Sequence, residues 1–127
     1  CDDDDPCTMD VCGTAAGCLH PAVTSWDSVL CVFERRVIPF ECRNPLPEPL
    51  AARLEKAELL LNVASAEPHP RPACRTLKRA GRSARKAQRF ATRWRDSGLL
   101  PFHCGQAIVD QMIFLRARIQ ELRPGVC

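Results

Sequence analysis

Hydrophobic residues recur at helical spacing in three stretches of the chain after Pro49. In the first stretch they step by four and three positions, at Leu50, Leu54, Ala57, Leu61 and Ala64. The same step continues at Leu77, Ala80, Ala84, Ala87, Ala91 and Trp94, and again at Ile108, Met112, Leu115, Ile119 and Leu122. A step of about 3.6 residues places such side chains on one face of a helix. The pattern predicts a mainly α protein, with helices over roughly 50–66, 73–96 and 103–122 forming an antiparallel three-helix bundle over residues 50–127.

Proline and glycine mark the expected ends of these helices. Pro49 suits the first position of a helix, and the three prolines at 68, 70 and 72 are expected to break the chain before the second helix. Gly98 is a candidate left-handed cap at the end of the second helix, with Pro101 just beyond it. Pro124 and Gly125 are expected to close the third helix.

The first 49 residues precede the helical pattern, and residues 1–20 fit neither a helical nor a strand period. Residues 1–20 hold four cysteines among turn-forming residues, so we expect a small irregular head whose structure is set by disulfides. Residues 21–49 form a connector. Within it, Val29–Phe33 and Val37–Phe40 are short β-prone runs that together permit a small hairpin.

The composition points to an oxidising compartment. Nine of the 127 residues are cysteines, a density typical of secreted domains in which disulfides support a small core. No window of about 18 apolar residues is present, which predicts that no transmembrane helix exists. We expect any secretion signal to have been removed or to lie outside this chain. The composition argues against a large α/β enzyme, a disordered tail and a membrane span, and it favours an extracellular or cell-surface protein.

The predicted bundle suggests two disulfides. Cys74, at the start of the second helix, would lie at the same end of an up-down-up bundle as Cys127. Cys104, at the start of the third helix, would lie at the other end near Cys42. We therefore expect the pairs Cys42–Cys104 and Cys74–Cys127, each closing a long loop and contributing on the order of 4 kcal/mol on the chain-entropy model.

The odd number of cysteines leaves one of them over. We expect the head cysteines Cys1, Cys7, Cys12 and Cys18 to pair among themselves, so that Cys31 stays unassigned. A bridge from Cys31 to the head, or to another chain, would resolve the count. An alternative is a lipid anchor on Cys1, as at the start of a mature bacterial lipoprotein, which would leave an even number of thiols.

Charge is distributed unevenly along the chain. Residues 1–20 carry five aspartates and no lysine or arginine, whereas residues 71–95 carry ten basic residues and no acid. Seven of these cations fall on the helix face opposite the apolar one: Arg75, Lys78, Arg82, Arg85, Lys86, Arg89 and Arg93. Such a stripe attracts polyanions. The alternative is a solvated outer face, partly neutralised by Glu48, Glu55 and Glu58.

The head resembles a known repeat. Its sequence CDDDDPCTMDVCGTAAGCLH is similar to the cysteine-rich C-D-D-G-x-P-C-T-x-D-x-C repeats of secreted slime-mould and myxobacterial proteins, with Asp4 in place of the usual glycine. More weakly, the tail resembles the FIMAH-like helical modules at the C-terminus of bacterial secreted proteins, through Leu54–Ala57 and Ala73–Leu77. Both resemblances imply an extracellular, non-catalytic module.

The acidic head is also a candidate metal site. Asp2, Asp3, Asp5 and Asp10 offer the oxygen ligands that calcium prefers, although their spacing is not that of an EF-hand loop. The alternative is that these aspartates cap turns on a solvated loop. The cysteines lack the close pairs typical of zinc sites, so disulfides are favoured over zinc.

Catalysis has little support in the sequence. His103 and Cys104 are the one adjacent pair of a base and a nucleophile, and we expect Cys104 to be bridged instead. No common hydrolase, zinc-protease or phosphate-loop motif is present. We therefore expect no enzyme activity and no cofactor other than calcium.

These patterns favour a secreted or cell-surface structural or interaction protein. The first hypothesis is a subunit that assembles or adheres through its acidic head and basic helix, with other copies of itself as partner. The alternative is an accessory module that binds an anionic extracellular polymer such as a polysaccharide, lipopolysaccharide or extracellular DNA. Sequence-specific recognition of nucleic acid is not expected, because the basic stripe offers nothing that would read base edges.

Overall fold

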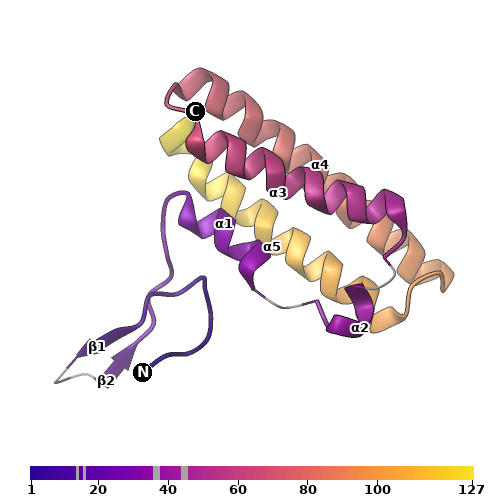
Figure 1. Cartoon of the computed structure of the whole chain (residues 1–127), viewed down its shortest axis with the longest axis horizontal. Coiled ribbons are helices and arrows are strands. Elements are labelled where there is room, and N and C mark those ends of the chain that lie inside the picture. Colours follow the sequence, from indigo (N-terminus) through magenta and orange to yellow (C-terminus); the bar gives the residue numbers. More distant parts are fainter. Residues whose placement is uncertain (14, 16, 36–37, 44–45) are drawn as a thin grey trace.

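The structure is a computed structural model that describes residues 1–13, 15, 17–35, 38–43 and 46–127. It is mainly helical, as predicted (Figure 1). Three long helices follow one another through short connections: α3 (Glu48–Ala66), α4 (Pro70–Ser97) and α5 (Phe102–Val126). Before them come the strands β1 (Val11–Gly13) and β2 (Gly17–Leu19) and the short helices α1 (Asp27–Glu34) and α2 (Phe40–Arg43).

The long helices occupy the predicted stretches, but two of their ends differ. Pro70 and Pro72 do not break the chain before α4. They lie in its first turn, where a backbone N–H has no intrahelical acceptor and its loss costs little. At the other end, α5 continues past Pro124 to Val126. Gly98 does cap α4 with a positive φ of 77°, as expected for a left-handed C-cap.

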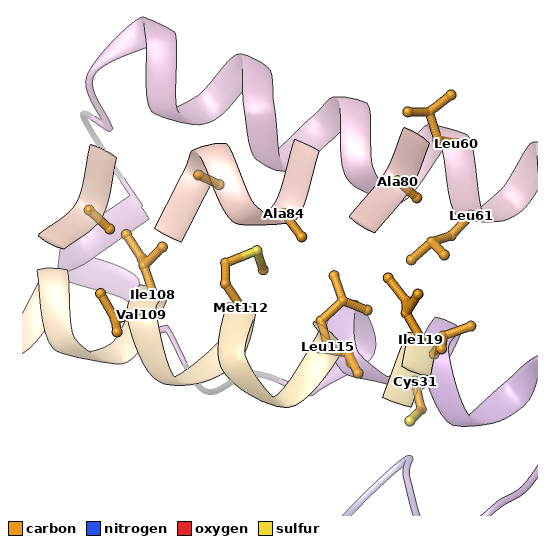
Figure 2. Close-up of a cluster of buried hydrophobic side chains, with 14 of the residues drawn as sticks. Cys31, Leu60, Leu61, Ala80, Ala84, Ile108, Val109, Met112, Leu115 and Ile119 are labelled. Atoms are coloured by element: carbon orange, nitrogen blue, oxygen red, sulfur yellow. The ribbon is translucent and has the colours of Figure 1, made fainter. Parts of the chain in front are cut away.

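The middle helix α4 packs against both of its long neighbours, α3 and α5. Its buried face consists largely of alanine, with Ala80, Ala84, Ala87 and Ala91 fully buried. Small side chains let the neighbouring helices approach closely, and larger residues from α3 and α5 complete the core. Figure 2 shows Leu61, Met112 and Leu115 pointing into the space beside Ala80 and Ala84.

The connector contributes to this core, and it does so as a helix. Val29 and Val32 of α1 are almost completely buried, and α1 packs against both α3 and α5. The hairpin predicted for Val29–Phe33 is therefore wrong. The second predicted strand is not formed either, since Phe40 begins α2, while Val37 lies outside the described residues. Burial of one helical face overrides the β-propensity of a short valine-rich run.

The predicted bundle of three helices is not confirmed as such, because α1 also packs against two of the long helices. The arrangement has α4 on one side of α3 and α5, and α1 on the other side of the same two helices (Figure 1). The amide of Gln111 in α5, itself buried, donates a hydrogen bond of 2.9 Å to the Val32 carbonyl in α1. This bond and the packing of the two valines hold α1 in place.

Four disulfides connect these elements: Cys1–Cys18, Cys7–Cys31, Cys42–Cys104 and Cys74–Cys127. The last two are the pairs predicted from the ends of the bundle. The pairing of all four head cysteines with one another is wrong, because Cys7 bonds to Cys31 and Cys12 is a free, exposed cysteine. Cys31 lies on the buried face of α1, so its bridge ties the head to the helical core.

Candidate anion-binding surface and acidic head

The predicted basic stripe is present along the outside of α4. We call it the basic face. All seven of its side chains are exposed: Arg75, Lys78, Arg82, Arg85, Lys86, Arg89 and Arg93. The alanine face of α4 turns inward, so the helical period places these cations on the outer side. The basic face is thus a direct consequence of how α4 packs.

The structure adds cations that the sequence pattern of α4 could not predict. Arg53 and Lys56 come from α3, and Arg116 and Arg123 come from α5. They join the basic face only because α4 lies between these two helices. Arg79 of α4 is exposed as well and lies toward α3. The guanidinium of Arg116 donates a 2.7 Å hydrogen bond to the Gln88 side chain of α4, which holds it against the basic face.

Shallow grooves run along both sides of the basic face. The α4–α5 groove has a volume of about 250 Å³ and is lined by Lys78, Gly81, Arg82, Arg85, Arg116, Ile119, Gln120 and Arg123. On the other side, the α3–α4 groove has a volume of about 190 Å³ and is lined by Arg53, Lys56, Leu60, Arg79, Arg82, Ser83 and Lys86. Farther along the same side, a third depression of about 280 Å³ is lined by Arg53, Lys86, Arg89, Phe90 and Arg93. Cations line every one of these depressions, and no described residue places a carboxylate in them.

In the described part of the chain, the cations of the basic face have no anionic partner. Among the described residues, the arginines that form ion pairs are Arg35, Arg95 and Arg118, and none belongs to the basic face. The glutamates expected to neutralise the stripe, Glu48, Glu55 and Glu58, make no ion pair with it in the described part of the chain. An array of like charges of this kind gains from the binding of an external anion.

A hydrogen bond between helices shapes the α3–α4 groove. Ser83 is a buried polar residue in α4, and its hydroxyl donates a 3.0 Å hydrogen bond to the Arg53 carbonyl of α3. This contact fixes the distance between the two helices at the base of the groove. It also positions the backbone from which the Arg53 side chain extends.

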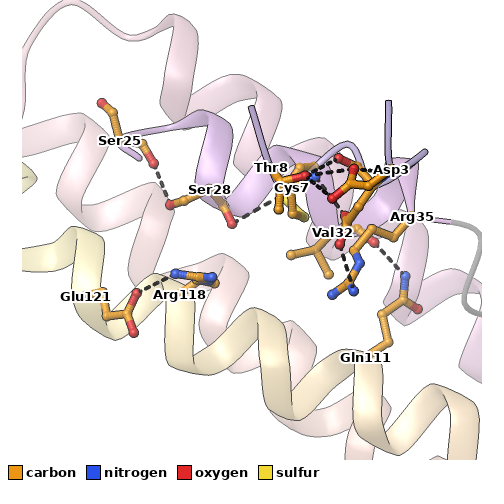
Figure 3. Close-up of a disulfide and its surroundings, with 12 residues drawn as sticks. Asp3, Cys7, Thr8, Ser25, Ser28, Val32, Arg35, Gln111, Arg118 and Glu121 are labelled. Atoms are coloured by element: carbon orange, nitrogen blue, oxygen red, sulfur yellow. Dashed lines mark hydrogen bonds and ion pairs between the residues drawn. A yellow bond between two sulfur atoms is a disulfide. The ribbon is translucent and has the colours of Figure 1, made fainter. Parts of the chain in front are cut away.

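The aspartates of the head mainly accept hydrogen bonds from nearby groups. Asp3 accepts from the Thr8 hydroxyl at 2.9 Å and from the Asp5 N–H at 2.9 Å (Figure 3). The hydrogen bond from the Asp5 N–H is the main cause that holds the pKa of Asp3 below its ordinary value. Desolvation opposes it, and the Thr8 hydroxyl and the nearby His20 lower the pKa further. This matches the turn-capping alternative for the acidic loop.

The four aspartates expected to bind calcium do not converge on one point. Asp10 lies 2.7 Å from the His20 ring, which is also 3.4 Å from Asp3. Asp5 turns instead toward Arg35 of the segment after α1, at 3.1 Å. Asp2 accepts a bond from the Asp4 N–H at 2.8 Å. The converging set of two carboxylates and one imidazole is not the shell of six to eight oxygens that calcium takes.

The pair of His103 and Cys104 holds no thiol. The Cys104 sulfur is 3.5 Å from the His103 ring, but it is buried and bonded to Cys42. A disulfide sulfur cannot serve as the thiolate nucleophile that this pair would need. The bridge therefore accounts for Cys104, as expected from the sequence.

None of the described helices combines the length and the apolar character needed to cross a membrane. The chain matches no protein-family model, no curated protein and no solved structure with which it was compared. The functional argument therefore rests on the surface chemistry of the molecule itself.

Proposed function

We propose that this chain is a secreted or cell-surface, non-catalytic interaction protein whose basic face binds an anionic extracellular polymer. The observation that carries the proposal is the run of unpaired cations along α4 with basic grooves on both sides. Arg75 and Arg93 are separated by about 27 Å at the helical rise of 1.5 Å per residue. A linear polyanion lying along α4 would meet cations over that whole length.

The chemistry favours recognition of charge density over recognition of sequence. Guanidinium groups pair well with sulfate, phosphate and carboxylate groups. Counterion release makes such binding strongly dependent on salt. The four disulfides suit a protein that works in an oxidising extracellular setting. Acidic polysaccharide, lipopolysaccharide and extracellular DNA share the chemistry that this surface would recognise.

The test is elution from a heparin column in a salt gradient. The double variant Arg82→Gln/Arg85→Gln removes two cations from the centre of the basic face. Its matched control, Arg43→Gln/Arg118→Gln, changes the net charge equally but lies off this face. We expect the first variant to elute at clearly lower salt than the wild type and the control to elute close to it. Equal shifts for the two variants would contradict the proposal, because net charge alone would then explain retention.

Binding of short DNA duplexes over a range of salt concentrations distinguishes a charge-density surface from a polysaccharide-specific one. The plot of log K against log salt has a negative slope. For every phosphate that a variant no longer neutralises, this slope should become less steep by about 0.9. We expect affinity for DNA without dependence on its sequence. Retention on heparin with no affinity for DNA would restrict the ligand to sulfated or carboxylated polysaccharide.

A second candidate partner is the acidic head of another copy, as in the self-assembly hypothesis. The observation that favours it is the position of the head, which joins α1 on the side of α3 and α5 away from α4 (Figure 1). The head therefore cannot neutralise the basic face of its own chain. Light scattering should then detect assemblies at low salt that disappear at high salt and in Asp2→Asn/Asp4→Asn. Identical scattering at all salt concentrations would rule out this charge-driven assembly.

A further inference from the structure

Three sulfur atoms lie together in the head. In the antiparallel pair of β1 and β2, Cys12 stands directly opposite Cys18, and Cys18 is bonded to Cys1. The sulfurs of Cys1, Cys12 and Cys18 all lie within 4.8 Å of one another, and all three residues are exposed. All nine cysteines are among the described residues, and Cys12 is the one without a covalent partner. The head thus holds one free thiol beside one accessible disulfide.

We infer that the Cys12 thiol exchanges with the Cys1–Cys18 disulfide, and that the same exchange between copies of this chain links their heads covalently. Within one chain, the Cys12 thiolate attacks the Cys18 sulfur. A Cys12–Cys18 bond forms, the Cys1–Cys18 bond breaks, and its electron pair stays on Cys1 as a thiolate. Attack on Cys1 instead releases Cys18. Each step conserves one disulfide and one thiol, so no oxidant or reductant is needed.

Burial protects two of the other three disulfides from this exchange. The sulfurs of Cys7–Cys31 and Cys42–Cys104 belong to residues that are almost completely buried. A thiol from outside cannot reach them while the chain is folded, and exchange rates depend on such access. These two bridges are therefore protected, while the head can rearrange. The Cys74–Cys127 bridge is more accessible, because Cys127 is exposed, and the variant below that lacks Cys1 and Cys18 shows whether it reacts.

Between two copies, the same step lengthens an assembly. The Cys12 thiolate of one copy attacks the Cys1–Cys18 disulfide of a second copy, which forms one intermolecular disulfide and releases one thiolate on the second head. That thiolate can attack a third copy. Oxidative pairing of two Cys12 thiols would differ, because it consumes both thiols and stops at a dimer.

The charge of the head gives this linkage its own salt dependence. Residues 1–20 carry five aspartates and no lysine or arginine, so two approaching heads repel one another. Salt screens this repulsion over a distance of about 10 Å at 0.1 M. Linkage should therefore be faster at high salt, whereas polyanion binding and charge-driven assembly weaken. Because linkage and polyanion binding respond to salt in opposite directions, a failure of this inference can be distinguished from a failure of the proposed function.

The test uses the whole protein kept under nitrogen with a chelator, so that no oxidant is present. Samples are quenched with an alkylating reagent and separated on a denaturing gel without reductant, and free thiols are counted. We expect a ladder that disappears on reduction, grows faster in high salt and retains one free thiol per chain. A chain that stays monomeric, or a dimer formed with loss of thiols, would overturn the linkage between copies.

Two variants keep the test specific. Cys12→Ser removes the exposed nucleophile and should give no ladder while retaining the circular dichroism spectrum and heparin retention of the wild type. Cys1→Ser/Cys18→Ser keeps the Cys12 thiol but removes the disulfide that it attacks, and it should also give no ladder without oxidant. A ladder in either variant would contradict the mechanism.

A mass map of the alkylated monomer tests exchange within one chain. We expect the label on more than one of the three cysteines Cys1, Cys12 and Cys18. Label on Cys12 alone would show that the disulfide stays where it is, and it would overturn the exchange within the chain.

Discussion

The close approach of α4 and α5 at Gly105 makes a sharp prediction for stability. Gly105 is buried near the start of α5, and a Cβ added there would lie 2.5 Å from the Cβ of Arg95 and 3.3 Å from the Ala91 carbonyl oxygen. Both atoms belong to α4, and neither can swing away, because one is backbone and the other is fixed directly to it. The Gly105→Ala substitution therefore forces the two helices apart.

The size of the effect follows from two opposing contributions. Overpacking of a well-packed core costs typically about 1–3 kcal/mol. Replacing glycine with alanine inside a helix returns about 0.8–1 kcal/mol through helix propensity. We therefore expect Gly105→Ala to lower the free energy of unfolding by roughly 0.5–2 kcal/mol.

The matched control is the same substitution at Gly81 in α4. A Cβ at Gly81 would lie 3.8 Å from the Cγ2 of Ile119, which is an ordinary van der Waals distance. With no clash to oppose helix propensity, Gly81→Ala should raise the free energy of unfolding by about 0.5–1 kcal/mol. One chemical change thus has opposite expected signs at two positions on the same interface.

Urea unfolding followed by far-ultraviolet circular dichroism measures both variants with their disulfides intact. The slope of free energy against urea concentration should stay constant, so that a shift in midpoint reports stability alone. A Gly105→Ala protein as stable as Gly81→Ala would refute the reasoning, since it would mean that α4 and α5 do not approach as closely as described.

Three further predictions concern the groove, the head and a bridge. Ser83→Ala removes the hydrogen bond to the Arg53 carbonyl and should cost about 0.5–1 kcal/mol in urea unfolding, whereas Ser83→Thr should retain part of that stability. The folded-state pKa of Asp3 is lowered, so its stabilising contribution is present above the ordinary aspartate pKa of 3.8 and is lost as the pH falls through the folded value. A carboxyl NMR titration should accordingly show Asp3 ionised below that ordinary pKa, and a midpoint at or above it would contradict the hydrogen bonding in the head. The Cys42–Cys104 bridge spans 62 residues. Changing both cysteines to alanine should lower the free energy of unfolding by about 4 kcal/mol on the chain-entropy model, as measured by urea unfolding against the wild type.

The local pattern was sufficient for the long helices and for the inside and outside of α4. Alanine at steps of three and four can bury only one face of a helix, so the arginines and lysines between them had to face outward. The same reasoning placed Cys74 and Cys104 at opposite ends of the helical array. Those two bridges were therefore predictable once the three helices were taken to run up, down and up in an antiparallel bundle.

The role of the connector was not predictable from its local sequence. Val29, Val32 and the cysteine between them suit a strand as well as a short helix, because both β-propensity and helical spacing fit a run of this length. This run forms a helix because one face of α1 covers the apolar surface of α3 and α5. Once Cys31 lay on that buried face, it paired with Cys7, and Cys12 became the free thiol.

The candidate sites divide in the same way. The sequence by itself determined the exposed cations of α4, because the periodicity of one helix assigns its two faces. Only the tertiary structure decided that Arg53 and Arg116 border the same surface, because these residues are distant along the chain. Only the structure decided, too, that Cys12 is the head cysteine left free, because Cys7 pairs with the distant Cys31. Periodicity orients side chains within an element, whereas proximity between elements depends on how their apolar faces pack.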